Sequence, residues 1–316
     1  MSNPATSVAF FGPAGTFTEE ALLTQEDYAA AVLVPKTLIA EVLEAVQNGQ
    51  VDIGFVPIEN AIEGTVNATL DALVFDFDLF IQREVVLDVH LHLMAPHGTK
   101  LDEVRRVLSF PVALAQCRHY LASELPGAET IAANSTADAA RLLGEHPEPG
   151  TAAIAPRLAA ELYGLSILGE DIEDHSDNQT RFVAVAPSSI TAPTGHDRTS
   201  IVCYQDADRP GNLHGILGQF AARNINLTKL ESRPTKKGLG DYCFVIDLAG
   251  HVDDEVVADC LRDLHAELGR VKFLGSYPAA GASAPTRRLE ADRAWQEADV
   301  WLTGLRSKVR RAPDGS

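Results

Sequence analysis

A short apolar run meets a glycine-rich turn in Val8-Ala9-Phe10-Phe11-Gly12-Pro13-Ala14-Gly15, and Thr16-Phe17-Thr18-Glu19 follows it. The apolar run predicts a strand, and Thr16 with Glu19 fits a capping box at the start of a helix. A strand, a turn and a capped helix direct backbone N–H groups outward, which favours an anion site. The turn lacks the full glycine spacing of a dinucleotide site and the lysine of a phosphate loop, so no nucleotide site is predicted. A plain strand-to-helix turn remains an open alternative.

The same alternation continues downstream, with a strand predicted at 31–34, a helix at 38–46 and a strand at 53–57. This order indicates a mostly parallel sheet. Glu59 and Asn60 directly follow the third strand, and ligands collect outside the carboxyl ends of such strands. Both residues are therefore candidates for binding. The alternative is that Asn60 and Glu63 only cap a helix at 66–74.

Residues 77–94 contain long strand-like runs that are typical of a crossing between two lobes. His90 and His92 would project from one strand face there. Two histidines at this spacing, with no acidic or cysteine ligand nearby in the sequence, favour a solvated face over a metal site. No metal site is predicted.

The second lobe repeats helices and strands, and its third helix begins at Asn134-Ser135-Thr136 with Asp138 at the capping-box spacing. The predicted helices are 100–106, 113–125, 135–143 and 158–163, and the predicted strands are 107–110, 130–133 and 152–156. The chain then reaches Asp177-Asn178-Gln179-Thr180-Arg181-Phe182. A hydroxyl, two amides and a guanidinium so close together suit a small carboxylate, although a polar turn is the open alternative. Two such lobes predict a cleft that closes over a small acid.

Residues 188–197 form a linker by composition, and the following elements have the order of a ferredoxin-like βαββαβ motif. The predicted strands are 199–205, 227–232, 242–248 and 271–277, with helices at 211–223 and 253–268 and a turn at 236–240. A small sheet of this kind usually pairs with a copy of itself, so the motif is interpreted as a regulatory module. The tail at 281–316 is predicted to be helical, with a stripe at positions 298, 302, 305 and 309 beside Trp301.

Composition excludes several classes of function. The chain has 316 residues and a net charge of -18, which argues against nucleic-acid and anionic membrane surfaces. Its four cysteines are scattered singly, which favours reduced thiols in a cytoplasmic protein. No basic leader precedes an apolar stretch, and no run reaches the length of a membrane span.

Taken in order, the motifs resemble those of the prephenate dehydratase family over residues 8–278. The matching segments are 12–21 (GPAGTFTEEA), 57–60 (PIEN) with Glu63-Gly64, 134–137 (NSTA), 178–182 (NQTRF) and 231–234 (ESRP). The resemblance implies a two-lobed catalytic domain at 1–187, similar to a type 2 periplasmic-binding-protein fold, with lobe I at about 1–80 plus 168–187 and lobe II at about 81–167. It also implies an ACT regulatory domain at 198–280 that binds phenylalanine.

The resemblance also assigns candidate residues. It implies Thr180 as the catalytic residue and Asn60 as a substrate ligand, with Thr16, Ser135 and Thr136 at positions that hold carboxylates. Arg181, Phe182, Glu59 and Gln116 complete the substrate set; the family often has His-Pro-Gln where this chain has Phe110-Pro111-Val112. The implied phenylalanine site comprises Gly211, Asn212, Leu213, Asn226, Glu231, Ser232, Arg233 and Pro234, and Asn212 replaces a usual alanine.

The implied activity is that of a lyase in phenylalanine biosynthesis, which removes carbon dioxide and the ring hydroxyl from prephenate to give phenylpyruvate. No cofactor is expected, because the product gains an aromatic ring and the sequence has no signature of a cofactor site. The expected assembly is a homodimer or homotetramer formed through ACT domains. Two alternatives remain open: a non-catalytic binding protein for an amino acid or organic acid, and an arogenate dehydratase.

Overall fold

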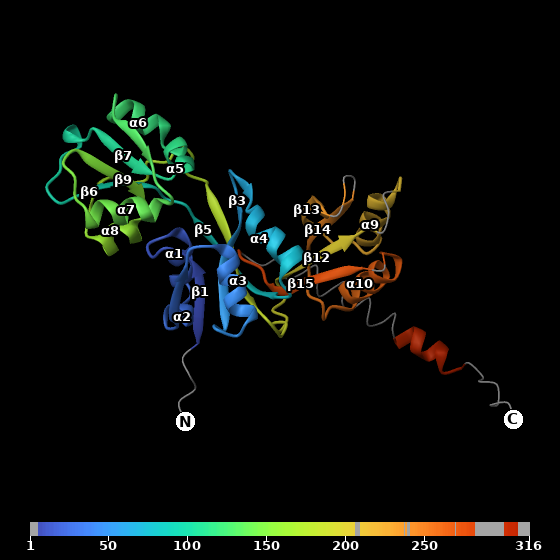
Figure 1. Cartoon of the computed structure of the whole chain (residues 1–316). Coiled ribbons are helices and arrows are strands. Elements are labelled where there is room, and N and C mark those ends of the chain that lie inside the picture. Colours follow the sequence, from blue (N-terminus) through green and yellow to red (C-terminus); the bar gives the residue numbers. More distant parts are fainter. Residues whose placement is uncertain are drawn as a thin grey trace, which may run out of the picture. The chain divides into compact units, whose positions relative to one another are not determined.

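The computed structural model describes residues 6–205, 209–236, 238, 241–268, 270–281 and 300–308 (Figure 1). Contacts divide the chain into two compact units. The first comprises Met1–Leu79 and Arg83–Ser188, and the second comprises Phe80–Gln82 and Ser189–Ser316. The assignment of Phe80–Gln82 to the second unit is a feature that the sequence did not predict. No described helix is both long and apolar enough to cross a membrane.

Apart from the first three residues of β5, the first unit contains a sheet with strand order β2-β1-β3-β11-β5, and β4 pairs with β3. Its strands are β1 Ser7–Phe11, β2 Val32–Lys36, β3 Ile53–Asn60, β4 Gly64–Thr65, β5 Phe80–Asp88 and β11 Gln179–Ala186. β1 is parallel to β2 and β3, as the alternation predicted, whereas β11 is antiparallel to β3. Phe55 and Phe182 stack at a centroid distance of 5.7 Å in the core of this sheet.

Helices beside this sheet follow from local sequence signals. They are α1 Phe17–Leu23, α2 Glu26–Ala29, α3 Ile39–Gln47 and α4 Asn67–Asp71, which continues as the π-helical turn η1 Ala72–Asp76. Thr16 caps α1 by accepting the N–H of Glu19, which confirms the predicted N-cap, but Glu19 accepts the N–H of Gly15 rather than that of Thr16, so the second bond of a capping box is replaced. α3 buries Val42, Leu43 and Val46 on one stripe, as the periodicity predicted.

A second sheet of the same unit has the order β10-β6-β9-β7-β8. The strands are β6 His92–Ala95, β7 Arg106–Ser109, β8 Glu129–Ala132, β9 Thr151–Ala155 and β10 Ser166–Gly169; the helices are α5 Pro111–Gln116, α6 Arg118–Glu124, α7 Thr136–Glu145 and α8 Arg157–Tyr163, and a 3-10 turn, η2, spans Leu101–Glu103. Figure 1 shows these helices in green around their sheet. Ser135 caps α7 by accepting the N–H of Asp138 at 2.9 Å, as predicted.

Three expectations for this region need correction. The helix predicted at 100–106 is only the turn η2, because the N–H groups of Arg105 and Arg106 bond to the carbonyl of Gly150 and lead into β7. The helix predicted at 113–125 begins earlier and breaks at Cys117, which has a non-helical backbone. The lobe boundaries also shift, because β5 belongs to the first sheet and β10 to the second. The chain therefore crosses between the sheets at 89–91 and 170–178 rather than at 80–81 and 167–168.

The second unit contains the predicted βαββαβ motif in an antiparallel sheet of order β13-β14-β12-β15. Its elements are β12 Asp197–Tyr204, α9 Asn212–Ala221, β13 Leu227–Pro234, β14 Tyr242–Ala249, α10 Glu255–Leu268 and β15 Val271–Pro278. Ile216 and Phe220 of α9 pack with Leu264 of α10 in one core cluster.

Residues 300–306 form a helix within the predicted helical tail. Trp301 is 66% exposed there, and Leu302 and Leu305 are also exposed. Positions 298 and 309 of the predicted apolar stripe lie outside the described residues, as do 237, 239 and 240 of the turn predicted at 236–240.

Candidate active site and effector pocket

A cavity of about 280 Å³ in the first unit gathers most of the predicted substrate residues. Thr180 and Phe182 of β11 both line it, because alternate residues of a strand face the same side. The lining residues are Phe11, Gly12, Thr16, Phe17, Thr18, Pro57, Asn60, Glu63, Val89, Leu91, Phe110, Val112, Ala113, Gln116, Asn134, Ser135, Thr136, Asn178, Thr180 and Phe182. Of the nine substrate-site residues predicted from the sequence, seven are in this set: Thr16, Asn60, Gln116, Ser135, Thr136, Thr180 and Phe182.

Asn60 lies opposite Thr180 in the β3/β11 register, and its amide joins several groups at the end of β3. Its Nδ2 donates to Thr180 Oγ1 and to Asn178 Oδ1, both at 2.9 Å. Its Oδ1 accepts the N–H groups of Ile62 and Glu63, each at 2.9 Å. These two backbone donors fix which end of the amide is oxygen, so the NH₂ group must face Thr180. The alternative that Asn60 and Glu63 only cap the following helix is wrong, because α4 has Val66 as its N-cap and no side-chain cap bond.

The direction of the Asn60 bond determines what Thr180 can do. Because Thr180 Oγ1 accepts from Asn60 Nδ2, the hydroxyl proton of Thr180 is available to donate to another group. A hydroxyl that acts as a nucleophile would instead need a neighbouring acceptor to take its proton. The geometry therefore favours Thr180 as a hydrogen-bond donor toward a ligand in the cavity.

Two helix starts bring further polar groups to the cavity. Thr16 is the N-cap of α1, and Ser135 and Thr136 stand at the cap and first position of the ten-residue helix α7. The N-terminal end of a helix carries partial positive charge, which favours an anion. Gln116, at the end of α5, also lines the cavity, and its Oε1 accepts a long contact of 3.4 Å from Asn178 Nδ2.

Among the described residues that line the cavity, Glu63 is the one formally charged side chain, and none is a lysine, arginine or histidine. An anionic ligand would therefore be held by neutral hydroxyl, amide and backbone N–H donors. Cys117 follows Gln116, but burial raises the pKa of its thiol to about 12. A thiol with that pKa is almost entirely protonated at neutral pH, which argues against thiolate chemistry here.

Two predicted substrate residues, Arg181 and Glu59, lie outside the cavity lining. Arg181 alternates with Thr180 and Phe182 along β11 and therefore faces the other side of the sheet. Its Nη2 is 3.0 Å from Glu59 Oε2 on β3, and its Nη1 is 3.2 Å from Glu84 Oε2 on β5. The Arg181 side chain is only 8% exposed and that of Glu84 only 1%. Arg181 thus bridges two carboxylates, one on each strand that flanks β11, on the face of the sheet that is turned away from the cavity.

Sequence reasoning left out other residues of the cavity. Asn134 and Asn178 stood within quoted motifs, and their amide side chains were the available signal. Phe110 and Val112 flank Pro111 at the start of α5, and both line the cavity. Val89 and Leu91 on the first crossing segment gave no signal, because their exposure to the cavity depends on contacts distant in the sequence.

A separate pocket of about 540 Å³ lies in the second unit around the start of α9. Four predicted effector residues line it: Gly211, Asn212, Leu213 and Ser232. Glu231, Arg233, Asn226 and Pro234 are not among its lining residues; Glu231 pairs with Arg233 at 3.3 Å along β13. The additional lining residues are Gln205, Arg209, His214, Leu217, Tyr242 and Phe244. Aromatic and aliphatic walls beside one arginine suit an amino acid with an apolar side chain.

Comparisons with known proteins match the two units to two families. The prephenate dehydratase family model matches residues 8–189, and the ACT domain model matches residues 199–266. The prephenate dehydratase of Mycolicibacterium smegmatis is 41% identical over 312 residues, which covers 95% of this chain and 97% of that protein.

Solved structures show the same fold. The crystal structure of prephenate dehydratase from Arthrobacter aurescens in complex with L-Phe has a TM-score of 0.86 at 40% identity and covers 96% of this chain and 100% of that one. GqqA, described as a novel type of quorum-quenching acylase, has a TM-score of 0.77 at 29% identity and covers 87% of this chain and 98% of that one. The matched family model and the nearly full-length relatives show that the chain belongs to the prephenate dehydratase family.

Proposed function

We propose that this protein converts prephenate to phenylpyruvate in phenylalanine biosynthesis, with loss of carbon dioxide and of the ring hydroxyl as water. The observation that carries the proposal is the Asn60–Thr180 bond of 2.9 Å in the cavity. It leaves the Thr180 hydroxyl as a donor, and the departing hydroxyl of the substrate needs a donor while negative charge develops on its oxygen.

The reaction requires little more than positioning and one polarised bond. As the ring carboxylate leaves as carbon dioxide, the electrons of its C–C bond move into the ring and the C–O bond on the opposite carbon breaks. The hydroxyl leaves as hydroxide, which takes a proton from solvent to give water, and the ring becomes aromatic. Thr180 is too weak an acid to give up its proton unaided, so its role is to hydrogen-bond the leaving oxygen.

Binding of a substrate with two carboxylates is assigned to neutral donors. Thr16 at the start of α1 and Ser135 with Thr136 at the start of α7 present hydroxyl and backbone N–H groups to the cavity. Asn60 and Gln116 add amide donors, and Phe182 contributes an apolar wall. We assign Arg181 and Glu59 a structural role in joining strands of the sheet. They do not contact substrate in this assignment, because they pair with each other outside the cavity lining.

Regulation by L-phenylalanine is assigned to the pocket at the start of α9. The support is the gathering of Gly211, Asn212, Leu213 and Ser232 there and the L-Phe complex of the Arthrobacter aurescens relative.

Assembly as a homodimer or homotetramer through ACT domains remains a proposal. It is supported by the place of β13 at an edge of its sheet, with residues that alternate between half-buried and exposed, because an edge strand is a template for pairing with a second chain. A cytoplasmic location agrees with four buried cysteines that form no disulfide.

Three other functions have some support. Glu63 would offer a carboxylate to the ammonium of arogenate, so arogenate dehydratase is the nearest alternative. A non-catalytic binding protein would explain the cavity but not the second pocket. The likeness to GqqA raises an acylase, yet a hydroxyl nucleophile needs a base, whereas Thr180 receives a bond from an amide donor.

The test is the turnover of prephenate and arogenate, side by side, by the purified full chain with and without millimolar L-phenylalanine. We expect phenylpyruvate from prephenate and suppression of its formation by L-phenylalanine. Faster turnover of arogenate would reassign the substrate. No turnover of either compound, by protein that still binds L-phenylalanine, would favour the binding protein.

A further inference from the structure

The two segments that cross between the sheets of the first unit run beside each other. The N–H of Val89 donates to the carbonyl of Asn178 at 2.8 Å, and the N–H of Ile172 donates to the carbonyl of Leu91 at 2.8 Å. Val89 and Leu91 face the cavity, and His90, which lies between them, is not part of its lining. The side chain of His90 therefore meets groups of the second crossing that are far from it in the sequence.

Three side chains converge at this place. Nδ1 of His90 is 3.0 Å from Glu173 Oε1 and 3.5 Å from Asp171 Oδ1. All three ligand atoms lie within 4.8 Å of one another. Donor atoms around a tetrahedral zinc ion, with bonds of roughly 2.0–2.1 Å, are about 3.3 Å apart. The two separations from His90 Nδ1 are close to this value, and the separation between the two carboxylates is at most 4.8 Å.

Hydrogen bonds outside the cluster fix both acidic residues, at the carboxylate of Glu173 and at the backbone of Asp171. Glu173 Oε2 accepts the N–H of Leu91 at 2.8 Å, which turns Oε1 toward His90, and the Glu173 side chain is only 2% exposed. The N–H of Asp171 donates to His92 Nδ1 at 3.1 Å. Supporting hydrogen bonds of this kind orient metal ligands in proteins. Asp171 is 60% exposed, so the site is open to water, which can complete the coordination.

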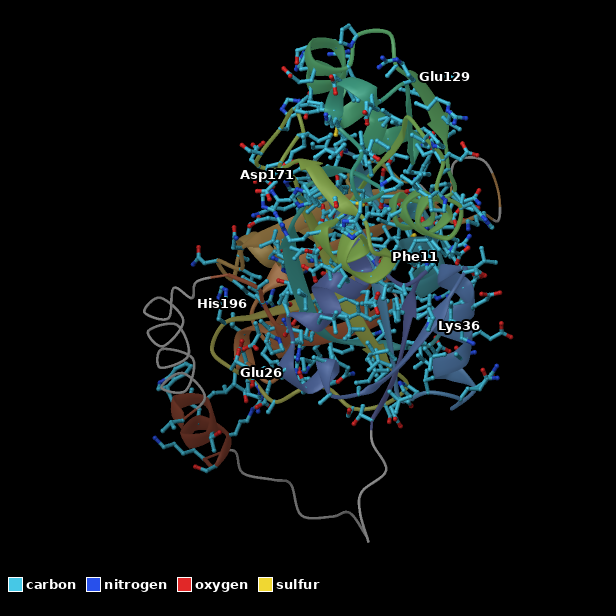
Figure 2. All side chains as sticks on the ribbon, turned by 90° about the vertical axis from the view of Figure 1, so that its left-hand side faces the viewer. Phe11, Glu26, Lys36, Glu129, Asp171 and His196 are labelled. Carbon is cyan, nitrogen blue, oxygen red and sulfur yellow. The ribbon has the colours of Figure 1, made fainter. Side chains whose placement is uncertain are left out.

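In the view of Figure 2, Asp171 lies between Glu129, which belongs to the second sheet, and Glu26, which lies near the first sheet. One imidazole and two carboxylates carry a formal charge of −2 when the imidazole is neutral, and Asp88 adds to the negative field around His90. Imidazole and carboxylate ligands together suit a borderline cation such as Zn²⁺.

We propose that His90, Asp171 and Glu173 form a binding site for a divalent cation of the Zn²⁺ type that joins the two crossing segments. The histidine comes from the first crossing and both carboxylates come from the second. A bound ion would tie the segments together directly behind Val89 and Leu91, and so would restrain movement of one sheet relative to the other. The proposal does not depend on the reaction that the cavity supports.

The experiment uses the full chain after removal of metals with a chelator. Zn²⁺ is titrated by calorimetry, and Co²⁺ is titrated by visible absorption, which reports the geometry around the ion. The variants are His90→Gln and Asp171→Asn; asparagine is chosen because it tolerates the left-handed backbone of residue 171, where φ is 48°. The matched control is His119→Ala, because His119 pairs with the single carboxylate of Asp174 at 3.4 Å and is 76% exposed.

We expect one Zn²⁺ per chain, a rise in Tm with added Zn²⁺, and an affinity at least tenfold weaker in both variants but unchanged in the control. A Tm without metal close to that of the parent would show that each variant is folded. The proposal is overturned if the parent protein binds neither Zn²⁺ nor Co²⁺ when the free ion is present at about 100 micromolar. It is equally overturned if both variants keep the parent affinity, or if the control loses it as well.

Discussion

Thr180 and Asn60 act as a unit, because the amide both positions the hydroxyl and decides the direction of its hydrogen bond. The Asn60 oxygen is occupied by two backbone N–H groups, so the amide cannot rotate to accept from Thr180 without losing both bonds. A preorganised donor costs no rearrangement when charge develops in the transition state. Replacement of Thr180 should therefore change kcat without a matching change in KM.

For Thr180→Ala we expect kcat to fall by about 10² to 10³, with little change in KM, since a donor of this kind acts mainly in the transition state. Thr180→Ser keeps the hydroxyl and is the matched control, which should retain most of the activity. Steady-state kinetics with prephenate measure both constants. A kcat for the alanine variant equal to that of the parent would remove Thr180 from the mechanism.

Arg181 differs from Thr180 because it lies outside the cavity lining and its guanidinium pairs with carboxylates. For Arg181→Met we expect the free energy of unfolding to fall by about 3–5 kcal/mol, since the buried Glu84 carboxylate would lose its charge partner. Urea denaturation measures this change. Adding Glu84→Gln to Arg181→Met should restore part of the loss. An unchanged stability together with a large rise in KM would instead indicate that Arg181 contacts the substrate.

Among the elements, those with local signals were predictable from sequence and those that depend on distant pairing were not. The caps at Thr16 and Ser135 and the βαββαβ order needed only neighbouring residues, and the structure confirms them. The assignment of β5 to the first sheet depends on β11, about a hundred positions later, and no local pattern contains that pairing. The groups around His90 were missed for the same reason, because Asp171 and Glu173 lie about eighty positions away.

Within the second unit, the start of α9 gives a prediction at the level of one element. Gly211 is its N-cap, with φ 91° and ψ −8°, and a left-handed backbone costs a residue other than glycine about 1–2 kcal/mol. Gly211→Ala should therefore shift Asn212 and Leu213 and weaken L-phenylalanine binding, on the order of tenfold. Calorimetric titration with L-phenylalanine measures the affinity. Gly215→Ala in the same helix is the control, since a methyl group there meets no atom within 4 Å. Equal affinities in the two variants would contradict this role for the Gly211 turn.

At the scale of the whole molecule, charge sets a condition on how an anionic substrate arrives. The net charge of −18 repels a substrate with two carboxylates. In many sites for anions a lysine or arginine offsets such a field, but the described lining of this cavity has none and includes Glu63. Hydroxyl and amide donors act only over short range, so repulsion should dominate until the substrate enters.

The kinetic consequence is an unusual dependence on salt. We expect kcat/KM for prephenate to rise severalfold between 10 and 150 mM NaCl, because the screening length falls from roughly 30 Å to about 8 Å. Potassium chloride should give the same curve, which separates screening from specific ion effects. Glu63→Gln removes the charge nearest to the substrate, so it should raise kcat/KM at low salt and flatten the curve. If kcat/KM instead falls as salt is added, a cationic group attracts the substrate, and the assignment of binding to neutral donors is wrong.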